Sequence, residues 1–426
     1  MKKPFFWWCL AGGLFLRLLA WWLLPSVLAD DAAYYQQIGI NLLREGRYFG
    51  SEGLAFRPPL QPFFIFLIYY FGGISVWLVS LIQIGLSLLT AVLIGQLASL
   101  LFNQKVGGLA LILAALSFDL SLFAPLLMSE SLVIFLIVFG FWALVKERHF
   151  LSGSAWGLGV LGKPLLLPVF LVVSFGTKKR KVFENRKIGF IFCLLLILPA
   201  LGWSVRNWLV FQKPVFISTN GGLNFYIGNN PYSRGSYDQN TKKALSLFPA
   251  RSETKENELY FQEGIKFVKR KPLKAISNLV RKPFYLLATF GGSAEGLIIR
   301  KVERGSFGAT NIMRLFFGAG QLFTYWLVLL GAIYFWLTSK KFKQGVRLVL
   351  VFVFGYFISL LPFFTFPRFR LPLLPFLIIL AGAGIVNFFK KPNPNKLKLA
   401  LFVFVLLTIR DGLKLVKFVF RLVGII

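Results

Sequence analysis

The chain has 426 residues, of which 57% are hydrophobic and 17% aromatic, and its mean hydropathy is +0.70. A water-soluble globular protein could not cover that much apolar side chain, so the composition excludes this class. The formal net charge is +32. We attribute it to cytoplasmic loops and to contact with anionic lipid headgroups, and we expect no nucleic-acid partner because no soluble basic domain is recognisable.

Repeated apolar stretches predict an all-α, polytopic membrane protein with about ten or eleven transmembrane helices, because about 20 apolar residues cross a hydrocarbon core. The first predicted span covers residues 5–25. Lys2 and Lys3 precede it and place its start in the cytoplasm. We expect this span to be retained as a signal anchor.

Residues 26–61 should then lie outside the cytoplasm. Residues 62–71 are apolar but too few to span, so we expect a juxtamembrane helix along the interface that ends at Gly72 and Gly73. Three further spans are predicted at residues 74–102, 107–125 and 130–146.

The apolar stretch 150–177 has basic residues on both flanks and is interrupted by Gly162-Lys163-Pro164. Each arm has about 14 residues, or roughly 21 Å of helix. Proline ends a helix, so we expect a short helical hairpin with Lys163 at its apex, in the outer half of the membrane.

Residues 188–209 are predicted to cross outward, and the polar region 210–310 should lie outside, with a helix near residues 253–268. Spans at 311–338, 348–366 and 373–389 follow, then an apolar segment at 397–409 and an interfacial basic tail at 413–426. The predicted domains are residues 1–209, with a catalytic first outer loop at 26–73, an extracytoplasmic region at 210–310, and a C-terminal membrane part at 311–426.

This topology brings one set of polar residues to the outer face. They are Asp30, Asp31, Arg57, Glu130, Lys163, Arg206, Asn207, Arg368 and Arg370. Arginine and lysine bind phosphate oxygens, and a carboxylate can take a proton from an attacking hydroxyl. The set therefore favours a transferase that uses a lipid-phosphate donor.

Each of these residues also has a structural interpretation. The paired acids or Glu130 could cap or stabilise a helix start, and Lys163 could extend to the interface without binding anything. Arg57 and Arg206 could position backbone, while Arg368 and Arg370 could anchor lipid headgroups. The sequence leaves these alternatives open.

The run D-A-A-x-Y, L-L-x-x-G-x-Y and R-P-P-L-x-P, which starts at Asp31 and ends at Pro62, resembles the first outer loop of GT-C glycosyltransferases. These are enzymes of the dolichyl-phosphate-mannose-protein mannosyltransferase and aminoarabinose transferase type. Further motifs agree in order along residues 5–390: Ser129-Glu130-Ser131-Leu132, Gly162-Lys163-Pro164, Arg206-Asn207-Trp208, Asn220-Gly221-Gly222, Gly228-Asn229-Asn230-Pro231 and Arg368-Phe369-Arg370-Leu371-Pro372.

The resemblance implies a GT-C-like helical bundle with Asp31 as the catalytic aspartate and Asp30 as the alternative. The substrate-binding residues that it implies are Tyr35, Arg57, Glu130, Lys163, Arg206, Asn207, Arg368 and Arg370. A sugar would pass from a polyprenyl-phosphate donor to a lipid, glycan or protein acceptor, with inversion, on the extracytoplasmic face of the cell membrane.

A transporter or flippase for lipid-linked sugars is the alternative function, and a non-catalytic assembly factor is a third.

Adjacent acids could hold Mg²⁺ or Mn²⁺, but the first outer loop has no DxD motif. We therefore expect no metal and no other cofactor.

Overall fold

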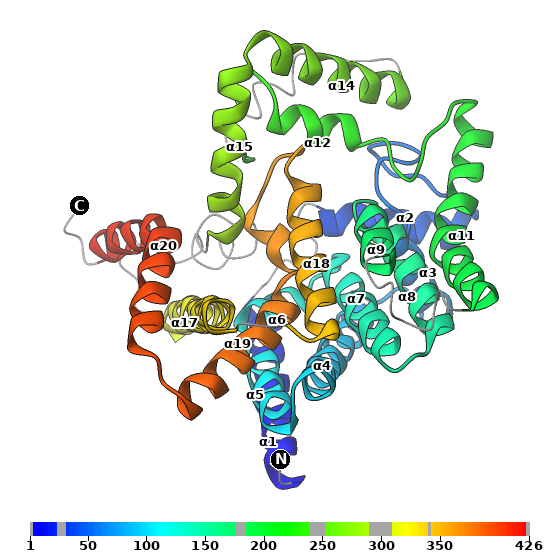
Figure 1. Ribbon diagram of the computed structural model, residues 1–426. Helices are drawn as coiled ribbons and strands as arrows, with labels where there is room; N and C mark the ends of the chain where they lie inside the picture. The colour runs from blue at the N-terminus through cyan, green and yellow to red at the C-terminus, as the bar shows by residue number, and fades with distance from the viewer. Residues whose placement is uncertain are drawn as a thin grey trace.

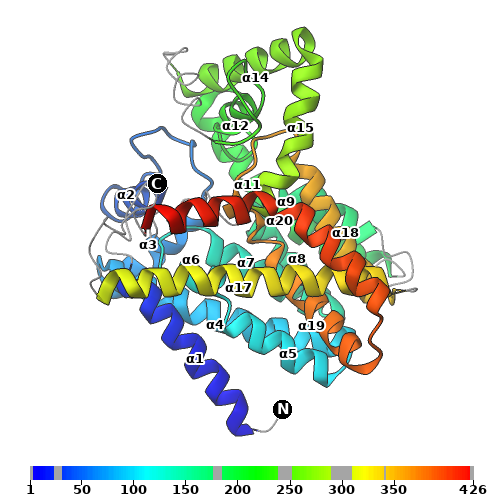
Figure 2. The same ribbon diagram turned by 90° about the vertical axis from the view of Figure 1, so that its left-hand side faces the viewer.

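The computed structural model describes residues 3–23, 31–175, 185–237, 252–288, 309–339 and 342–422. These residues are mostly helical, and their only β pairing consists of two isolated bridges, Gly50 with Gly53 and Ser236 with Thr365. Figures 1 and 2 show a large bundle from which α12, α14 and α15 project on one side. Asp30, one of the two predicted catalytic acids, lies outside the described residues.

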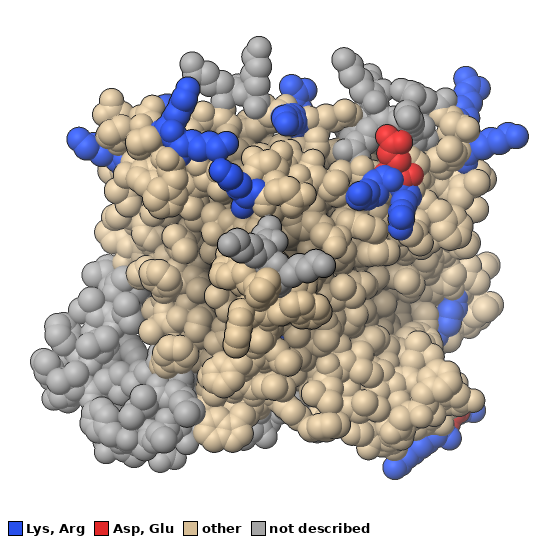
Figure 3. All heavy atoms as spheres, turned by 90° about the horizontal axis from the view of Figure 1, so that it is seen from below, with Lys and Arg blue, Asp and Glu red and all other residues tan. Residues whose placement is uncertain are grey.

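Four helices in the described ranges are long and apolar enough to cross a membrane: α1 (Lys3–Leu23), α4 (Val76–Leu101), α11 (Arg186–Phe211) and α17 (Ala309–Thr338). Six other apolar helices have 10–17 residues: α3 (Leu60–Gly72), α5 (Gln104–Ala115), α7 (Glu130–Val145), α9 (Leu166–Phe175), α18 (Gln344–Leu360) and α19 (Leu374–Lys390). These helices make the chain a multi-pass membrane protein, while the number of spans stays a prediction. One face of the bundle is largely uncharged, with lysine and arginine near its edges, as a lipid-facing surface would be (Figure 3).

Two of the boundaries predicted from the sequence are wrong. The expected span 107–125 is broken, because α5 ends at Ala115 and the Ser117 side chain caps the separate short helix α6 (Phe118–Phe123). The expected apolar segment and interfacial tail form one helix, α20 (Pro394–Leu422), since Asp411 and Gly412 do not interrupt it. A hydropathy pattern detects neither a serine cap nor the continuity of a helix.

The predicted hairpin break is confirmed. Helix α8 (His149–Gly162) is followed by Lys163 as its C-cap, and α9 begins at Leu166. Trp156 of α8 stacks on Phe170 of α9 with ring centroids 4.4 Å apart, which holds the two arms together.

Close helix packing in the bundle depends on small residues. A Cβ added to Gly384 of α19 would lie 2.1 Å from the Gly331 carbonyl oxygen of α17, so these backbones touch directly. This contact places α19, and the 3₁₀ turn η1 (Pro367–Arg370) that precedes it, against the bundle.

The region after α11 forms α12 (Gly221–Gly228), α14 (Glu253–Arg270) and α15 (Pro272–Leu287). The helix predicted near residues 253–268 is thus confirmed as α14. Tyr226 of α12 and Tyr260 of α14 are buried against each other, with ring centroids 5.4 Å apart. Helix α2 (Asp31–Glu45) packs on α3 (Leu60–Gly72). Helix α3 is the one predicted at residues 62–71, and its position along a membrane interface stays a prediction.

Candidate functional site

Asp31 is the centre of a charged cluster formed by distant parts of the chain. It is the first residue of α2, where the helix dipole favours an acid. Its Oδ1 lies 2.9 Å from Arg57 Nη1, and its Oδ2 lies 2.9 Å from Arg368 Nη2. Burial opposes ionisation of Asp31, but Arg368 and Arg57 outweigh it and hold the pKa of the carboxyl below its usual value. Asp31 is therefore an ionised carboxylate held from two sides.

Glu130 and Lys163 extend the cluster from Arg368. Lys163 Nζ lies 3.4 Å from Glu130 Oε1, and Arg368 Nε lies 3.5 Å from the same oxygen. Glu130 is the first residue of α7 and only 3% exposed, and its Oε2 has no hydrogen-bond partner. A buried acceptor without a partner is costly, so this oxygen is available to a polar group that enters the site.

Arg57 is also held by an acid that the sequence analysis missed. Its Nε and Nη2 donate to the two carboxylate oxygens of Glu52, at 2.7 and 3.0 Å. Burial raises the pKa of Glu52, and the nearby Arg57 partly offsets this effect. Glu52 lies in the turn closed by the Gly50–Gly53 bridge. It precedes Arg57 by only five residues, and this short separation was the signal in the sequence that could have identified the pair.

Arg370 is not part of this cluster. Its Nη2 donates to Asp119 Oδ1 at 2.8 Å, its Nη1 donates to the Ala288 carbonyl, and its guanidinium lies 4.3 Å from the centre of the Tyr325 ring. Gln321 donates to the same Asp119 oxygen at 3.0 Å. Asp119 was not predicted, although an acid in an otherwise apolar stretch is a signal in itself.

Arg206 and Asn207 hold backbone rather than the charged cluster. Arg206 donates to the carbonyls of Leu54 and Tyr48 at 2.9 and 3.1 Å, and its guanidinium lies 4.8 Å from the centre of the Trp203 ring. Asn207 donates to the carbonyls of Val215 and Ile217 at 3.3 and 3.2 Å. In this geometry Arg206 supports the loop that carries Arg57, and Asn207 supports the chain after α11.

Tyr35 lies one turn after Asp31 on α2 and is buried in the core. Burial, together with the charge of Asp31, raises the pKa of its hydroxyl. Tyr35 therefore stays a neutral phenol beside the cluster.

The loop that carries Arg57 is held from the opposite side by Glu253, the first residue of α14. The backbone amides of Leu54 and Ala55 donate to its two carboxylate oxygens at 2.8 and 3.0 Å, and the Thr219 hydroxyl donates to Oε1. Gly53 has φ +144°, and a Cβ there would lie 2.4 Å from Glu253 Oε2. Nothing in the sequence near Glu253 indicates this role, because its partners lie 198 and 199 residues earlier.

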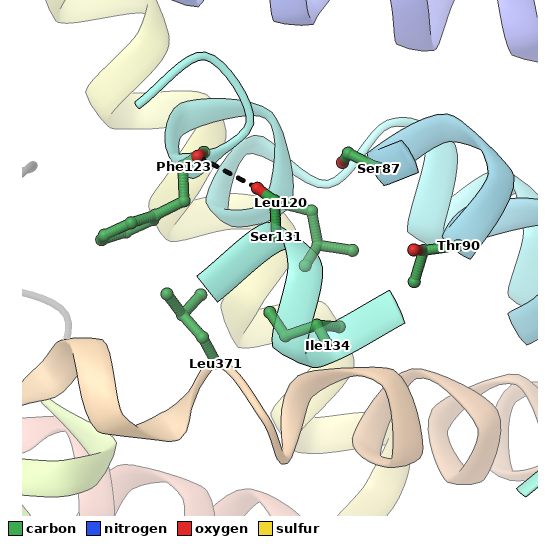
Figure 4. Close-up of a pocket in the computed structure, with 7 residues that line it drawn as sticks. All are labelled: Ser87, Thr90, Leu120, Phe123, Ser131, Ile134 and Leu371. Atoms are coloured by element: carbon green, nitrogen blue, oxygen red, sulfur yellow. Dashed lines mark hydrogen bonds between the residues drawn. The ribbon is translucent and has the colours of Figure 1, made fainter. Parts of the chain in front are cut away.

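A small cavity lies within the bundle. Its lining residues are Ser87, Thr90, Leu120, Phe123, Ser131, Ile134 and Leu371, and the Ser131 hydroxyl donates to the Phe123 carbonyl at 3.2 Å (Figure 4). Its volume of about 10 Å³ admits about one water molecule, not a sugar.

Among the residues that the structure describes, no three His, Cys, Asp or Glu side chains gather as metal ligands would. The acids of the cluster are instead each in contact with a cation. Cofactor independence stays a prediction.

No protein-family model matches the chain, and no curated protein matches its sequence. Among solved structures, the chain is similar to the oligosaccharyltransferase of Archaeoglobus fulgidus tethered to an acceptor peptide. The TM-score is 0.50 and the identity 15%, over 95% of this chain and 54% of that one. The same archaeal enzyme bound to an inhibitory peptide and dolichol-phosphate gives 0.49 and 14%, over 93% and 54% of the two chains.

ArnT from Cupriavidus metallidurans bound to undecaprenyl phosphate gives a TM-score of 0.37 and 15% identity, over 88% of this chain and 77% of that one. In these comparisons the chain spans about half the length of the archaeal oligosaccharyltransferase. Its fold is that of this oligosaccharyltransferase.

Proposed function

We propose that this protein is a membrane glycosyltransferase that moves a sugar from a polyprenyl-phosphate donor to an acceptor on the extracytoplasmic face. The observation that carries the proposal is the Asp31 carboxylate held between Arg57 and Arg368, beside Lys163 and the unpartnered oxygen of Glu130. The fold shared with an oligosaccharyltransferase supports it.

In the proposed reaction Asp31 accepts the proton of the acceptor nucleophile. The acceptor atom forms a bond to the anomeric carbon while the bond from that carbon to the phosphate oxygen breaks. The polyprenyl phosphate leaves with the electron pair, and Arg57, Lys163 and Arg368 neutralise its charge. A single displacement of this kind inverts the anomeric configuration.

Donor binding would also raise the pKa of Asp31 and make it a stronger base. Both of its oxygens contact arginines, which hold its pKa low and make it a weak base in the free protein. A donor phosphate that binds the same arginines adds negative charge beside Asp31 and raises its pKa toward the range of a useful base. Proton transfer would then be favoured only with donor bound.

The acceptor class is left to experiment. The archaeal neighbour carries an acceptor peptide, and a lipid, a glycan or a protein group would each supply the nucleophile needed here. We assign acceptor choice to residues 210–310, whose α14 contacts the loop that carries Arg57.

The test uses the full chain purified in detergent, a panel of polyprenyl-phosphate sugars and a membrane extract as acceptor source. Released polyprenyl phosphate is followed by mass spectrometry. Asp31→Asn should lower release by about 100-fold or more, the usual contribution of a general base. Glu258→Gln, which neutralises an exposed acid on α14, is the matched control and should leave release unchanged.

Two results would contradict the proposal. If the wild-type chain releases no polyprenyl phosphate from any donor, a transporter of lipid-linked sugars becomes the better interpretation. If the product retains the anomeric configuration by NMR, the single displacement by way of Asp31 is wrong even though a sugar is transferred.

A further inference from the structure

A second, larger cavity opens between α15 and α20, away from the charged cluster. Its volume is about 610 Å³, within the range of small-molecule sites. The lining residues are Arg234, Arg281, Phe284, Tyr285, Leu406, Leu407 and Ile409. Figures 1 and 2 both show α20 passing the C-terminal end of α15, and the two helices are in contact. We call this cavity the α15–α20 cleft.

One side of the α15–α20 cleft is cationic. Arg234 and Arg281 are both exposed, and neither forms an ion pair or a hydrogen bond within the described part of the chain. This differs from Arg57, Arg206, Arg368 and Arg370, each of which is held by acids or by carbonyl oxygens. Two arginines without partners at one cavity are complementary to an anion with more than one oxygen, such as a phosphate.

The other side of the cleft is aliphatic. Leu406 and Ile409 of α20 are 51% and 55% exposed, and Leu407 lies between them. Phe284 of α15 is 42% exposed and faces the same cavity. A free phosphate would leave these apolar side chains uncovered, whereas an alkyl chain attached to the phosphate would cover them.

We propose that the α15–α20 cleft binds an anionic phospholipid. Arg234 and Arg281 bind its phosphate, and its acyl chain lies along Leu406, Leu407 and Ile409. None of the residues of the charged cluster lines this cleft. The lipid is therefore a second ligand, and its binding does not depend on the proposed transfer reaction.

The test measures lipid retained by the full chain. The protein is delipidated in detergent and titrated with dioleoyl phosphatidylglycerol, and the bound lipid is counted by native mass spectrometry. Arg234→Gln and Arg281→Gln together should weaken the tightest binding step by about tenfold or more, since hydrogen bonds to a charged group are the stronger kind. The matched control neutralises two exposed cations elsewhere, Arg270→Gln with Lys271→Gln, and should bind as the wild type does.

A second pair of variants tests the aliphatic side. Leu406→Glu places a charge in the cleft and should weaken phosphatidylglycerol binding, whereas Leu401→Glu, at a position of the same helix that is 42% exposed and does not line the cleft, should not. Thermal unfolding of every variant identifies any loss of fold, and a variant that unfolds early is replaced by Arg281→Lys, for which weaker but measurable binding is expected.

Three outcomes would overturn the proposal. The arginine variants could bind phosphatidylglycerol as tightly as the wild type. Dioleoyl phosphatidylcholine, which has the same chains and no net charge, could bind equally well. Inorganic phosphate could displace the lipid at equal concentration, which would make the cleft an anion site without a role for the chain. None of these readouts uses sugar transfer, so failure here leaves the proposed function untouched.

Discussion

Arg368 and Arg370 show how much the surroundings decide the role of a residue. They are two positions apart on the short turn η1, and both were predicted to bind substrate. Arg368 contacts Asp31 and Glu130 in the charged cluster, whereas Arg370 is 1% exposed and pairs with the buried Asp119. We therefore assign Arg368 to the proposed chemistry and Arg370 to the placement of η1.

This assignment predicts opposite consequences for the two arginines. Arg368→Gln should lower sugar transfer by about 100-fold because it removes a cation from the leaving phosphate. Arg370→Gln should instead destabilise the protein by about 3–5 kcal/mol, since it leaves the Asp119 charge buried without its partner. Transfer assays and thermal unfolding in detergent measure the two effects.

The control for Arg370 is a double variant. Asp119→Asn added to Arg370→Gln removes the unpaired charge and should recover part of the lost stability. If Arg370→Gln unfolds at the wild-type temperature, or if the double variant is less stable than the single one, the structural role of the pair is wrong.

At the scale of elements, α15 forms hydrogen bonds with the segment between α18 and η1 and holds it in place. Lys282 Nζ donates to the Leu361 carbonyl at 2.6 Å, and the Thr365 hydroxyl donates to the Lys282 carbonyl at 3.1 Å. The Thr365 amide donates to Gly235 at 3.0 Å. The position of Arg368 thus depends on a helix outside the bundle.

Lys282 gives this contact a dependence on pH. It is 1% exposed, and burial lowers its pKa to about 8 from the usual 10.5. Between these two values the unfolded chain binds more protons than the folded one, so stability rises with pH over that window. At neutral pH the lysine is charged in both states, and the full cost of burying that charge is present.

The wild-type protein should therefore gain stability relative to Lys282→Met as the pH rises from about 7.5 to 10, by up to roughly 3 kcal/mol for a shift of this size. Thermal unfolding of both proteins across this range measures the difference, and Lys274→Met, at an exposed position of α15, is the control. A difference that stays constant with pH would show that Lys282 is not buried in this way.

At the scale of the whole molecule, the candidate site forms where the bundle meets the region of α12, α14 and α15. The Arg57 loop is held by Glu253 of α14 and by Arg206 of α11, while the Arg368 turn is held by α15 and by Asp119 of α6. Asp31 bridges the two arginines at the meeting point. The geometry of the site is therefore a property of the assembled parts.

Glu253→Ala tests this dependence. It leaves the Leu54 and Ala55 amides without their acceptor and should loosen the loop that carries Arg57, with a loss of transfer of about tenfold and a loss of stability of about 1–3 kcal/mol. The measurement is kcat and KM for the donor, with Glu258→Ala, 52% exposed on the same helix, as the control. Unchanged kinetics in Glu253→Ala would show that the site does not depend on its contact with α14.

The residues of the candidate site fall into two groups, those that lie in a sequence motif and those that do not. Asp31, Arg57, Glu130, Lys163 and Arg368 were found from motifs and from their position at span ends, and the structure brings them together. The acids that orient these cations or their segments had no such motif: Glu52, Asp119 and Glu253 were missed. A partner that lies 251 residues away, as Asp119 does from Arg370, leaves no local pattern to recognise.

The sequence by itself determined that this is a helical membrane protein, where its main apolar helices lie, and that its motifs resemble those of GT-C enzymes. Hydropathy and motif spacing are local properties of the chain, and so they can be read along it. Only the tertiary structure decided that Arg368 contacts Asp31 while Arg370 contacts Asp119, and that Arg206 holds backbone. The partner of a charge depends on which distant segments packing brings within a few Å of it, because the attraction between two charges weakens with distance and a buried charge without a partner is costly.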